Sequence, residues 1–372
     1  MKLLRVRADH FKNCSDAYTI DLVAKSRKTA EDKEYELQEI APGLFVFNTA
    51  AFVGKNASGK STAIDLLDCC YSILGEFRLE GKHYSYEDVK LEITFYHEGY
   101  LYIYDTVLSE ASSLSNQASF RNEHIYRKPY YKTNIKEIYD RESYTELTAV
   151  GELPEDTSNI FFVLKKKSTR AVCFDSFGNG PATYQMLFKA MKSYGISTDI
   201  LANILRIFDE NIDGLNQLDE HNYRLIFQGK ETVLSDTQLI YMLSSGTTKG
   251  LLLYTMVVAS LKEGFDLLID EVENHFHKTL VENMISLYKD KTVNRHQATL
   301  IFSTHYCEVL DQMGRQDNIW ICKANSHVYL SNMHEDYQIR PELLKSRQYY
   351  NNAFQTAVNY DELMGLKRKL KK

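Results

Sequence analysis

The chain has 372 residues, 44% of them hydrophobic, so it can bury a substantial core and, at roughly 150 residues per domain, form about two lobes. Its 50 acidic residues outnumber its 44 basic ones, and the net charge of -6 excludes a protein that binds nucleic acid through a generally basic surface. The most apolar stretch, Gly250 to Leu261, is about a dozen residues long, well short of the roughly 20 that cross a bilayer, so we expect no membrane-spanning segment.

Cysteine usage indicates the compartment. Six cysteines occur without any Cys-x-x-Cys pair, and the first residues do not resemble a signal peptide, so a reducing cytoplasm is the expected setting. Local basic clusters remain as candidates for DNA contacts, although each is typical of a solvated surface or tail. They comprise Lys165, Lys166, Lys167 and Arg170, and the C-terminal Lys367, Arg368, Lys369, Lys371 and Lys372.

The first elements are predicted to form a sheet. Lys2 to Phe11 alternates as a strand does, and Tyr18 to Val23 can pair with it. The charged stretch Lys25 to Glu36 is predicted to be a surface loop. Leu44 to Val53 is an apolar strand, and Thr62 to Phe77 has apolar residues at helical spacing.

A phosphate-binding loop lies between that strand and that helix. Gly54 to Ser61 fits the pattern Gly-x-x-x-x-Gly-Lys-Ser/Thr in full. Glycines let backbone N–H groups curl around phosphate oxygens, and the helix that begins near Lys60 presents its positive dipole end to the same anion. The residues expected to bind ATP here are Gly54, Lys55, Asn56, Ala57, Ser58, Gly59, Lys60, Ser61 and Thr62. Lys60 would contact the β and γ phosphates, and the Ser61 hydroxyl would ligate Mg²⁺.

The middle of the chain gives weaker signals. Leu91 to Tyr96 and Tyr100 to Val107 predict a β-hairpin. Ser109 to Leu153 is polar and tyrosine-rich with no sustained heptad, so a long coiled-coil arm is not expected. Thr183 to Ile212 is typical of one or two amphipathic helices.

A Ser-Ser-Gly turn precedes the next helix. Ser244, Ser245 and Gly246 follow Leu243, and an apolar helix covers Gly250 to Lys262. A turn of this kind at a helix N-terminus can bind an anion through backbone N–H groups and hydroxyls, although alone it is equally typical of a helix cap.

Two adjacent acids end the following strand. Phe265 to Ile269 is predicted to be a buried strand, and its apolar residues Leu267 to Ile269 lead into Asp270 and Glu271. A carboxylate at this edge can hold Mg²⁺ through its water shell, which we assign to Asp270, while Glu271 can act as the general base for the attacking water. The competing interpretation is that the two acids form an exposed turn. The phosphate-binding loop at Gly54 to Ser61, also known as a Walker A loop, favours the catalytic role.

A last apolar strand, Ala298 to Ser303, comes after a helix over His277 to Tyr288 and leads to His305. His305 is placed to contact the γ-phosphate. Zinc ligation is an alternative that the spacing of His275, His277, His305 and Cys307 does not favour, and a structural role is the simplest one for His275.

The order of these motifs resembles the ABC/SMC class of ATPases, and particularly stand-alone AAA-family members similar to OLD and RecF proteins. Asp270 to Asn274, followed by Phe276 and His277, resembles their extended Walker B pattern, and His10 to Asn13 is similar to their first turn. Three features depart from the pattern. No Q-loop glutamine occurs between Phe77 and Tyr96, His275 and Lys278 replace small residues and proline, and Asn352 replaces a glycine in a tail, Arg340 to Val358, similar to phage-resistance ATPases.

The resemblance, thin between Ser109 and Gln238, implies an α/β fold of the ABC/SMC-type ATPase head, with a mixed-sheet P-loop core, an antiparallel β subdomain and a helical lobe. The expected divisions are 1–108 and 239–335 for the two parts of the ATPase core, 109–238 for a variable, helical insertion and 336–372 for a tail.

The same resemblance implies a Mg²⁺-dependent ATPase that forms a homodimer or higher oligomer, with Ser244 to Gly246 of one copy contacting the ATP of the other. No Asp-x-Asp pair follows His305, so we expect no nuclease within this chain. The resemblance implies instead that its output passes to a separate effector, a Toprim or HNH nuclease, in antiphage defence. A RecF-like clamp on DNA is the alternative. A transporter subunit is disfavoured by the missing glutamine.

Overall fold

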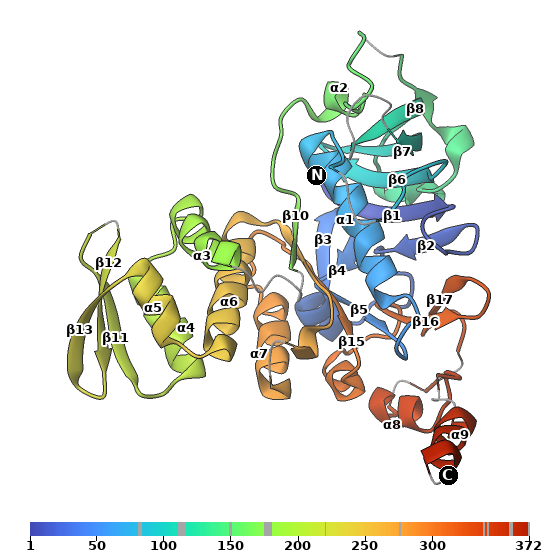
Figure 1. The fold of residues 1–372 in the computed structure, drawn as a ribbon. Helices are drawn as coiled ribbons and strands as arrows, with labels where there is room; N and C mark the ends of the chain where they lie inside the picture. The colour runs from blue at the N-terminus through green and yellow to red at the C-terminus, as the bar shows by residue number, and fades with distance from the viewer. Residues whose placement is uncertain are drawn as a thin grey trace.

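The computed structural model describes residues 1–80, 84–110, 117–148, 151–174, 181–219, 221–274, 277–337, 339–340, 342–356 and 360–370. A core sheet, an antiparallel sheet and a helical lobe make up the molecule (Figure 1). The expected α/β class with a mixed core sheet, an antiparallel subdomain and a helical lobe is therefore confirmed. In the described part of the chain, no helix is long and apolar enough to cross a membrane.

The core sheet has six strands in the order β10-β14-β15-β5-β16-β17, and all are parallel except β17, which pairs antiparallel with β16. Every residue of β5, β14 and β15 is buried, as expected for parallel strands covered on both faces. The bounds are Ala171–Phe174 (β10), Asp266–Ile269 (β14), Leu300–Thr304 (β15), Thr49–Val53 (β5), Ile319–Ala324 (β16) and Val328–Asn332 (β17).

Helices cover both faces of this sheet. Side chains alternate along β5, so Ala50 and Phe52 pack with α1 (Lys60–Glu76), whereas Ala51 and Val53 belong to the cluster of α6 (Ser245–Glu263) and α7 (Lys278–Lys289). Residues of the antiparallel sheet share the α1 cluster. Helix α1 therefore lies between the two sheets (Figure 1).

The antiparallel sheet has the order β2-β1-β6-β7-β8-β9. Its bounds are Tyr18–Asp21 (β2), Lys2–Asp9 (β1), Lys90–His97 (β6), Tyr100–Glu110 (β7), Ala118–Pro129 (β8) and Thr145–Glu146 (β9). The pairing of β1 with β2 and the β6–β7 hairpin confirm two predictions from the sequence. Strand β8 was not predicted, because half-exposed polar residues break its alternation. Two short turns, η2 (Lys132–Glu137) and η3 (Arg141–Ser143), precede β9.

The predicted strand over 44–53 is divided. Asn48 interrupts it, and its backbone N–H donates to the Glu36 carbonyl oxygen at 2.9 Å. The first half, β4 (Leu44–Phe47), pairs with β3 (Leu37–Ala41) in a separate ribbon, so only β5 enters the core sheet. Within the predicted loop Lys25 to Glu36, one helical turn, η1, covers Asp32–Glu36.

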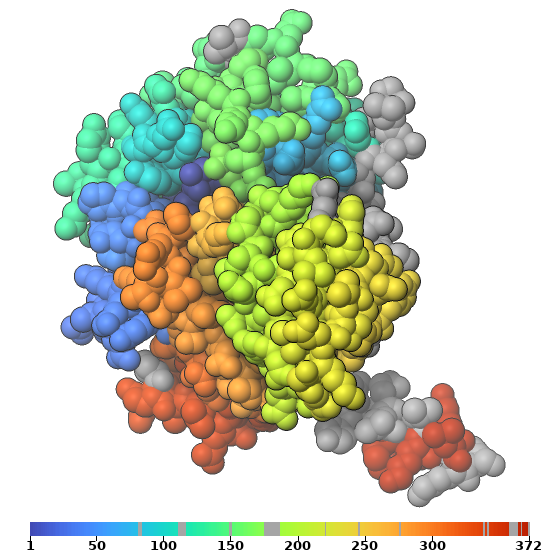
Figure 2. All heavy atoms as spheres, turned by 90° about the vertical axis from the view of Figure 1, so that its left-hand side faces the viewer, coloured from blue at the N-terminus to red at the C-terminus, as the bar shows by residue number. Residues whose placement is uncertain are grey.

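The helical lobe packs α3 (Pro181–Ser193) and α4 (Thr198–Phe208) on α6. The expected pair of amphipathic helices is thus confirmed. A three-stranded sheet, β11 (Ile212–Gln217), β12 (Asn222–Phe227) and β13 (Lys230–Ser235), leads into α5 (Asp236–Met242). In Figure 2 this lobe, in yellow-green and yellow, faces the viewer.

The range 109–238 is shared among all three parts. Strands β8 and β9 extend the antiparallel sheet, and α2 (Phe161–Leu164) follows them. Strand β10 pairs with β14 at the edge of the core sheet, and the helical lobe begins with α3.

The C-terminal tail packs against η5 (Cys307–Gln312) through α8 (Lys345–Tyr350), while α9 (Tyr360–Leu370) lies further out (Figure 1). Between them Asn352 has a φ of +59°. Glycine is the usual residue for this left-handed conformation, and asparagine tolerates it better than most, which explains the replacement seen in the tail motif. Pro341 and residues 357–358 of that motif lie outside the described residues.

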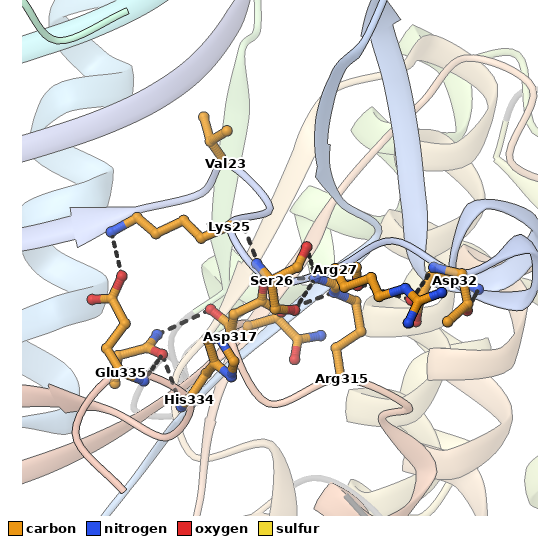
Figure 3. Close-up of polar contacts among 12 residues, drawn as sticks. Val23, Lys25, Ser26, Arg27, Asp32, Arg315, Asp317, His334 and Glu335 are labelled. Atoms are coloured by element: carbon orange, nitrogen blue, oxygen red, sulfur yellow. Dashed lines mark hydrogen bonds and ion pairs between the residues drawn. The ribbon is translucent and has the colours of Figure 1, made fainter. Parts of the chain in front are cut away.

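A buried arginine ties the loop after β2 to the C-terminal half (Figure 3). The guanidinium of Arg315 donates to Asp317 Oδ2 at 2.6 Å, to the Arg27 carbonyl oxygen at 3.2 Å and to Ser26 Oγ at 2.5 Å. It also pairs with Asp32 at 3.0 Å. These contacts hold the segment between β2 and η1 in place.

Candidate functional site

The loop after β5 requires glycine at two positions. Gly59 caps α1 with a φ of +95°, and a Cβ there would lie 2.1 Å from a methyl group of Val328. A Cβ on Gly54 would lie 2.6 Å from the Cys322 carbonyl oxygen. Strands β16 and β17 therefore press against the loop, and larger residues cannot replace these glycines without movement.

Lys60 is the buried cation of this loop. Its side chain is 4% exposed, and its Nζ lies 3.3 Å from each of the carbonyl oxygens of Gly54 and Lys55. Burial lowers the pKa of Lys60, while nearby acidic groups, including Glu271 and Glu273, oppose that shift. Among the described residues, the hydrogen-bond partners of this ammonium group are neutral carbonyl oxygens, so an anion entering the loop would find the charge available.

The other loop residues divide into exposed and buried positions. Lys55, Asn56, Ala57 and Ser61 are exposed, and Thr62 is half-buried at the start of α1. Ser58 is buried, and its Oγ finds no hydrogen-bond partner among the residues that the structure describes.

Parallel pairing brings the predicted motifs to one edge of the core sheet. Strand β15 lies between β5 and β14, with Thr304 opposite Val53 and Phe302 opposite Ile269. Each of these strands ends where a motif begins. The phosphate loop, the two acids and the histidine therefore meet at the carboxyl edge, where ligands bind in α/β sheets.

Ser303 joins two of these motifs. Its hydroxyl donates to Asp270 Oδ1 at 2.5 Å and accepts from the Glu271 backbone N–H at 2.8 Å. Glu271 has a φ of +48°, a costly conformation for a residue other than glycine. The serine thus fixes both the metal-binding candidate and the backbone of the base candidate.

The side chains around Glu271 form a second network. Asn274, the last residue of η4 (Val272–Asn274), donates to Glu271 Oε2 at 2.6 Å, and His305 Nε2 lies 3.8 Å from Glu271 Oε1. The His305 backbone N–H donates to Glu273 Oε1 at 2.5 Å. Sequence reasoning named Glu271 and His305 but missed Ser303, Glu273 and Asn274 as their partners. The polar residues that flank the two motifs were the available signal.

The structure describes one of the two residues, His275 and Lys278, that depart from the extended Walker B pattern. Lys278 is the first residue of α7, the position at which proline is favoured because its N–H needs no helical partner. His275 and Phe276 lie outside the described residues. Among the residues that are described, no three histidine, cysteine, aspartate or glutamate side chains are grouped to hold a metal ion.

Ser244, Ser245 and Gly246 lie elsewhere, at the start of α6 in the helical lobe (Figure 1). Ser244 caps this helix, with its Oγ accepting from the Thr247 N–H at 3.0 Å. Ser244 and Gly246 are exposed, and within the described ranges neither makes a hydrogen bond to the phosphate loop. The fold thus brings together Lys60, Asp270, Glu271 and His305, and it leaves the serine turn separate.

The donor atoms at the sheet edge suit a hard cation. Ser61 offers a hydroxyl and Asp270 a carboxylate, and Mg²⁺ takes oxygen ligands and usually combines one or two from protein with phosphate oxygens and water. These residues therefore fit a magnesium ion that arrives with a nucleotide.

The fold and this edge define the P-loop ATPase class. A family model described as "AAA domain, putative AbiEii toxin, Type IV TA system" matches residues 50–311. The chain belongs to this family of AAA-domain proteins, which confirms the AAA-family resemblance inferred from the motifs.

A search of solved structures finds a more distant likeness. The structure described as "Crystal structure of the SmcHead bound to the C-winged helix domain of ScpA" is 10% identical, with a TM-score of 0.46, and the match covers 89% of this chain and 97% of that chain. No curated protein sequence matches the chain.

Proposed function

We propose that the chain hydrolyses ATP and works as a switch that dimerises through composite ATP sites. The observation that carries the proposal is the meeting of three adjacent strand ends, which places Lys60, Asp270, Glu271 and His305 at one edge of the sheet. A buried cation for phosphates, a carboxylate for a metal and a second carboxylate for water are the parts that phosphoryl transfer to water needs.

Each residue has a distinct role in this proposal. Lys60 neutralises the β and γ phosphates, and Ser61 and Asp270 hold Mg²⁺, which offsets the charge that develops on the transferred phosphoryl group. Glu271 orients the attacking water and accepts its proton. His305, already beside Glu271, contacts the γ-phosphate and registers its loss.

The serine turn supports a role for a second copy. Ser244 and Gly246 are exposed at the N-terminus of a 19-residue helix, where backbone N–H groups and the helix dipole favour an anion. Their own phosphate loop lies in another part of the molecule. The γ-phosphate held by a partner's Lys60 supplies the missing anion, so ATP favours the closed dimer and hydrolysis removes that preference.

The first experiment compares the intact chain with Glu271→Gln, with and without ATP, by phosphate release and by mass in solution. Loss of the base should reduce turnover by a factor of about 100 or more while ATP stays bound, so the variant should double in mass with ATP. Hydrolysis by the intact chain with no nucleotide-dependent change of mass in either form would replace the composite site with a monomeric or preassembled ATPase.

A second comparison tests the serine turn in the Glu271→Gln background. Ser244→Asp and Ser244→Asn both keep a cap for the Thr247 N–H, but only aspartate adds a negative charge. We expect the aspartate variant to lose the ATP-dependent dimer, because that charge faces the partner's γ-phosphate, and the asparagine variant to retain it. Equal dimerisation of both would place the interface elsewhere.

We further propose a role in antiphage defence, with a separate Toprim or HNH nuclease as effector. The support is the family description, which names a toxin and a type IV toxin–antitoxin system, together with the tail motif. The test removes the neighbouring gene and measures plating of phage. Unchanged protection would reject the separate effector.

A DNA clamp has one specific observation in its favour. The last turn of α9 carries the exposed side chains of Lys367, Arg368 and Lys369. A clamp predicts ATP-dependent, salt-sensitive binding of DNA by the purified chain. The absence of binding at low salt would remove this function.

A further inference from the structure

A cavity lies at the edge of the core sheet opposite the candidate site, where β10, β14 and β15 begin. Its volume is about 520 Å³, within the range of roughly 300–1,000 Å³ typical of small-molecule sites. All three parts of the molecule line it. Lys2 and Tyr96 come from the antiparallel sheet, Arg170 and Asp266 from the edge of the core, and Tyr194 from the helical lobe.

Lys2, one of the cations that line the cavity, is already neutralised. Lys2 Nζ donates to Asp266 Oδ1 and to Thr299 Oγ1, each at 2.7 Å. The other oxygen of Asp266 accepts from the Tyr71 hydroxyl at 2.6 Å, and Oδ1 also accepts from the Thr299 N–H at 2.7 Å. Both oxygens of the Asp266 carboxylate therefore have hydrogen-bond partners, and within the described residues Asp266 forms no ion pair with Arg170.

Arg170 is an uncompensated cation of the cavity, which the N-terminal residue Met1 also lines. In the part of the chain that the structure describes, its guanidinium makes no hydrogen bond or ion pair, and its Nε is buried. Burial lowers the pKa of Arg170, and its charge adds to burial and the N-terminal amine in lowering the pKa of His97. Glu263 also lines the cavity but forms no ion pair with Arg170.

Two further donors stand next to Arg170. The Ser168 hydroxyl is buried and has no hydrogen-bond partner within the described ranges, and Thr169 is exposed along the cavity. A desolvated cation and a buried hydroxyl are both unfavourable without an acceptor. An anion with several oxygens satisfies both, and arginine recognises phosphate through paired N–H groups.

We propose that this cavity binds a small phosphate-bearing molecule, with the phosphate on Arg170 and on the hydroxyls of Ser168 and Thr169. The cavity is larger than a phosphate ion needs, and the rings of Tyr96, Tyr194 and Phe265 also line it. The ligand therefore carries an aromatic ring beside its phosphate, as a nucleoside monophosphate does. Because the lining comes from three parts of the molecule, the bound ligand fixes their relative positions.

The test uses the full chain carrying Lys60→Ala, which removes the cation of the phosphate loop, so that binding reports on the cavity around Arg170. Binding of AMP, inorganic phosphate and adenosine is measured by calorimetry. We expect AMP to bind most tightly, phosphate more weakly and adenosine least. Adding Arg170→Gln should weaken AMP binding about tenfold or more, because a charge-assisted pair is lost.

Two further variants separate a specific site from general charge. Lys167→Gln removes an exposed cation that pairs with Glu76 outside the cavity, and it should leave AMP affinity within about twofold. Arg170→Lys keeps the charge but loses the planar pair of donors, so its affinity should lie between those of arginine and glutamine. The proposal is wrong if AMP and phosphate both fail to bind the Lys60→Ala chain, or if Arg170→Gln binds AMP as tightly as arginine does.

Discussion

At the scale of single residues, the Ser303 hydroxyl holds Asp270 and the Glu271 backbone at once. Alanine at this position leaves the Asp270 carboxylate free to rotate and the Glu271 N–H without its acceptor. Partners of metal ligands usually affect metal affinity or activity by about 10–100-fold. We expect Ser303→Ala to lower ATP turnover by a factor in that range and to raise the Mg²⁺ concentration that gives half-maximal activity.

The control for Ser303 is threonine, which keeps the hydroxyl and should restore most of the activity. A second readout avoids turnover. Two chains are compared, Glu271→Gln alone and Glu271→Gln with Ser303→Ala. Mg²⁺ should strengthen the binding of a fluorescent ATP analogue less in the double variant than in the single one. If the alanine variant loses only stability and responds to Mg²⁺ as serine does, then Ser303 is a packing residue.

At the scale of elements, the segment between β2 and η1 depends on its contacts with Asp317 and Arg315 (Figure 3). The side chains of these two residues are each 2% exposed. Burial alone would raise the pKa of Asp317, but Arg315 and the backbone N–H groups of Lys25 and Ser26 outweigh it, so its pKa is lowered. A carboxyl group whose pKa is lower in the folded state stabilises the protein above its unfolded pKa, near 4, and loses this effect as pH falls through the folded value.

We therefore expect Asp317→Asn to lower the free energy of unfolding by about 3 kcal/mol at pH 7, since it leaves Arg315 short of a buried partner. The difference from the intact chain should be constant between about pH 7 and 5 and should shrink below about pH 4. Urea unfolding at several pH values measures it. Glu335→Gln is the control, because Glu335 pairs with Lys25 near the surface and should contribute less than about 1 kcal/mol. A difference that persists unchanged at low pH would contradict the prediction.

Helices and strands can be predicted from the sequence where the local pattern of apolar residues matches the burial of the element in the fold. Strands β14 and β15 are buried along their whole length and carry the apolar runs Leu267 to Ile269 and Leu300 to Phe302, because helices cover both of their faces. Strand β10, by contrast, has only half-buried residues at the edge of the sheet, and its partner β14 is distant in sequence. Its pairing depends on long-range packing that no local window contains.

At the scale of the whole molecule, the sequence motifs identify the residues of the candidate nucleotide site, but the order of the strands brings these residues together. Sequence reasoning named Lys60, Asp270, Glu271 and His305, because their spacing reflects chemistry that tolerates few substitutes. It could not show that β15 lies between the other two strands, which is what lets Ser303 reach Asp270. The cavity around Arg170 was also beyond prediction, since its walls come from three parts of the fold.

The tail joins this assembly partly through an aromatic side chain. Phe354 is fully buried in the hydrophobic cluster that also contains Val309 and Leu310 of η5, and its ring packs edge-on against Tyr337, another tail residue, with the centroids 5.0 Å apart. Nearby, Lys345 Nζ donates to the Met313 carbonyl oxygen at 2.7 Å, and the Ser346 N–H donates to Asp311 at 3.0 Å. These contacts hold the tail against η5, which begins two residues after His305.

We expect Phe354→Ala to lower the free energy of unfolding by about 3–5 kcal/mol, because it leaves a cavity, and Phe354→Leu to cost clearly less. Loosening η5 also frees the segment that carries His305, so ATP turnover of the folded alanine variant should fall as well. Denaturant unfolding and phosphate release, both below the transition temperature, measure the two effects. If stability falls and turnover does not, the tail supports the fold without setting the position of His305.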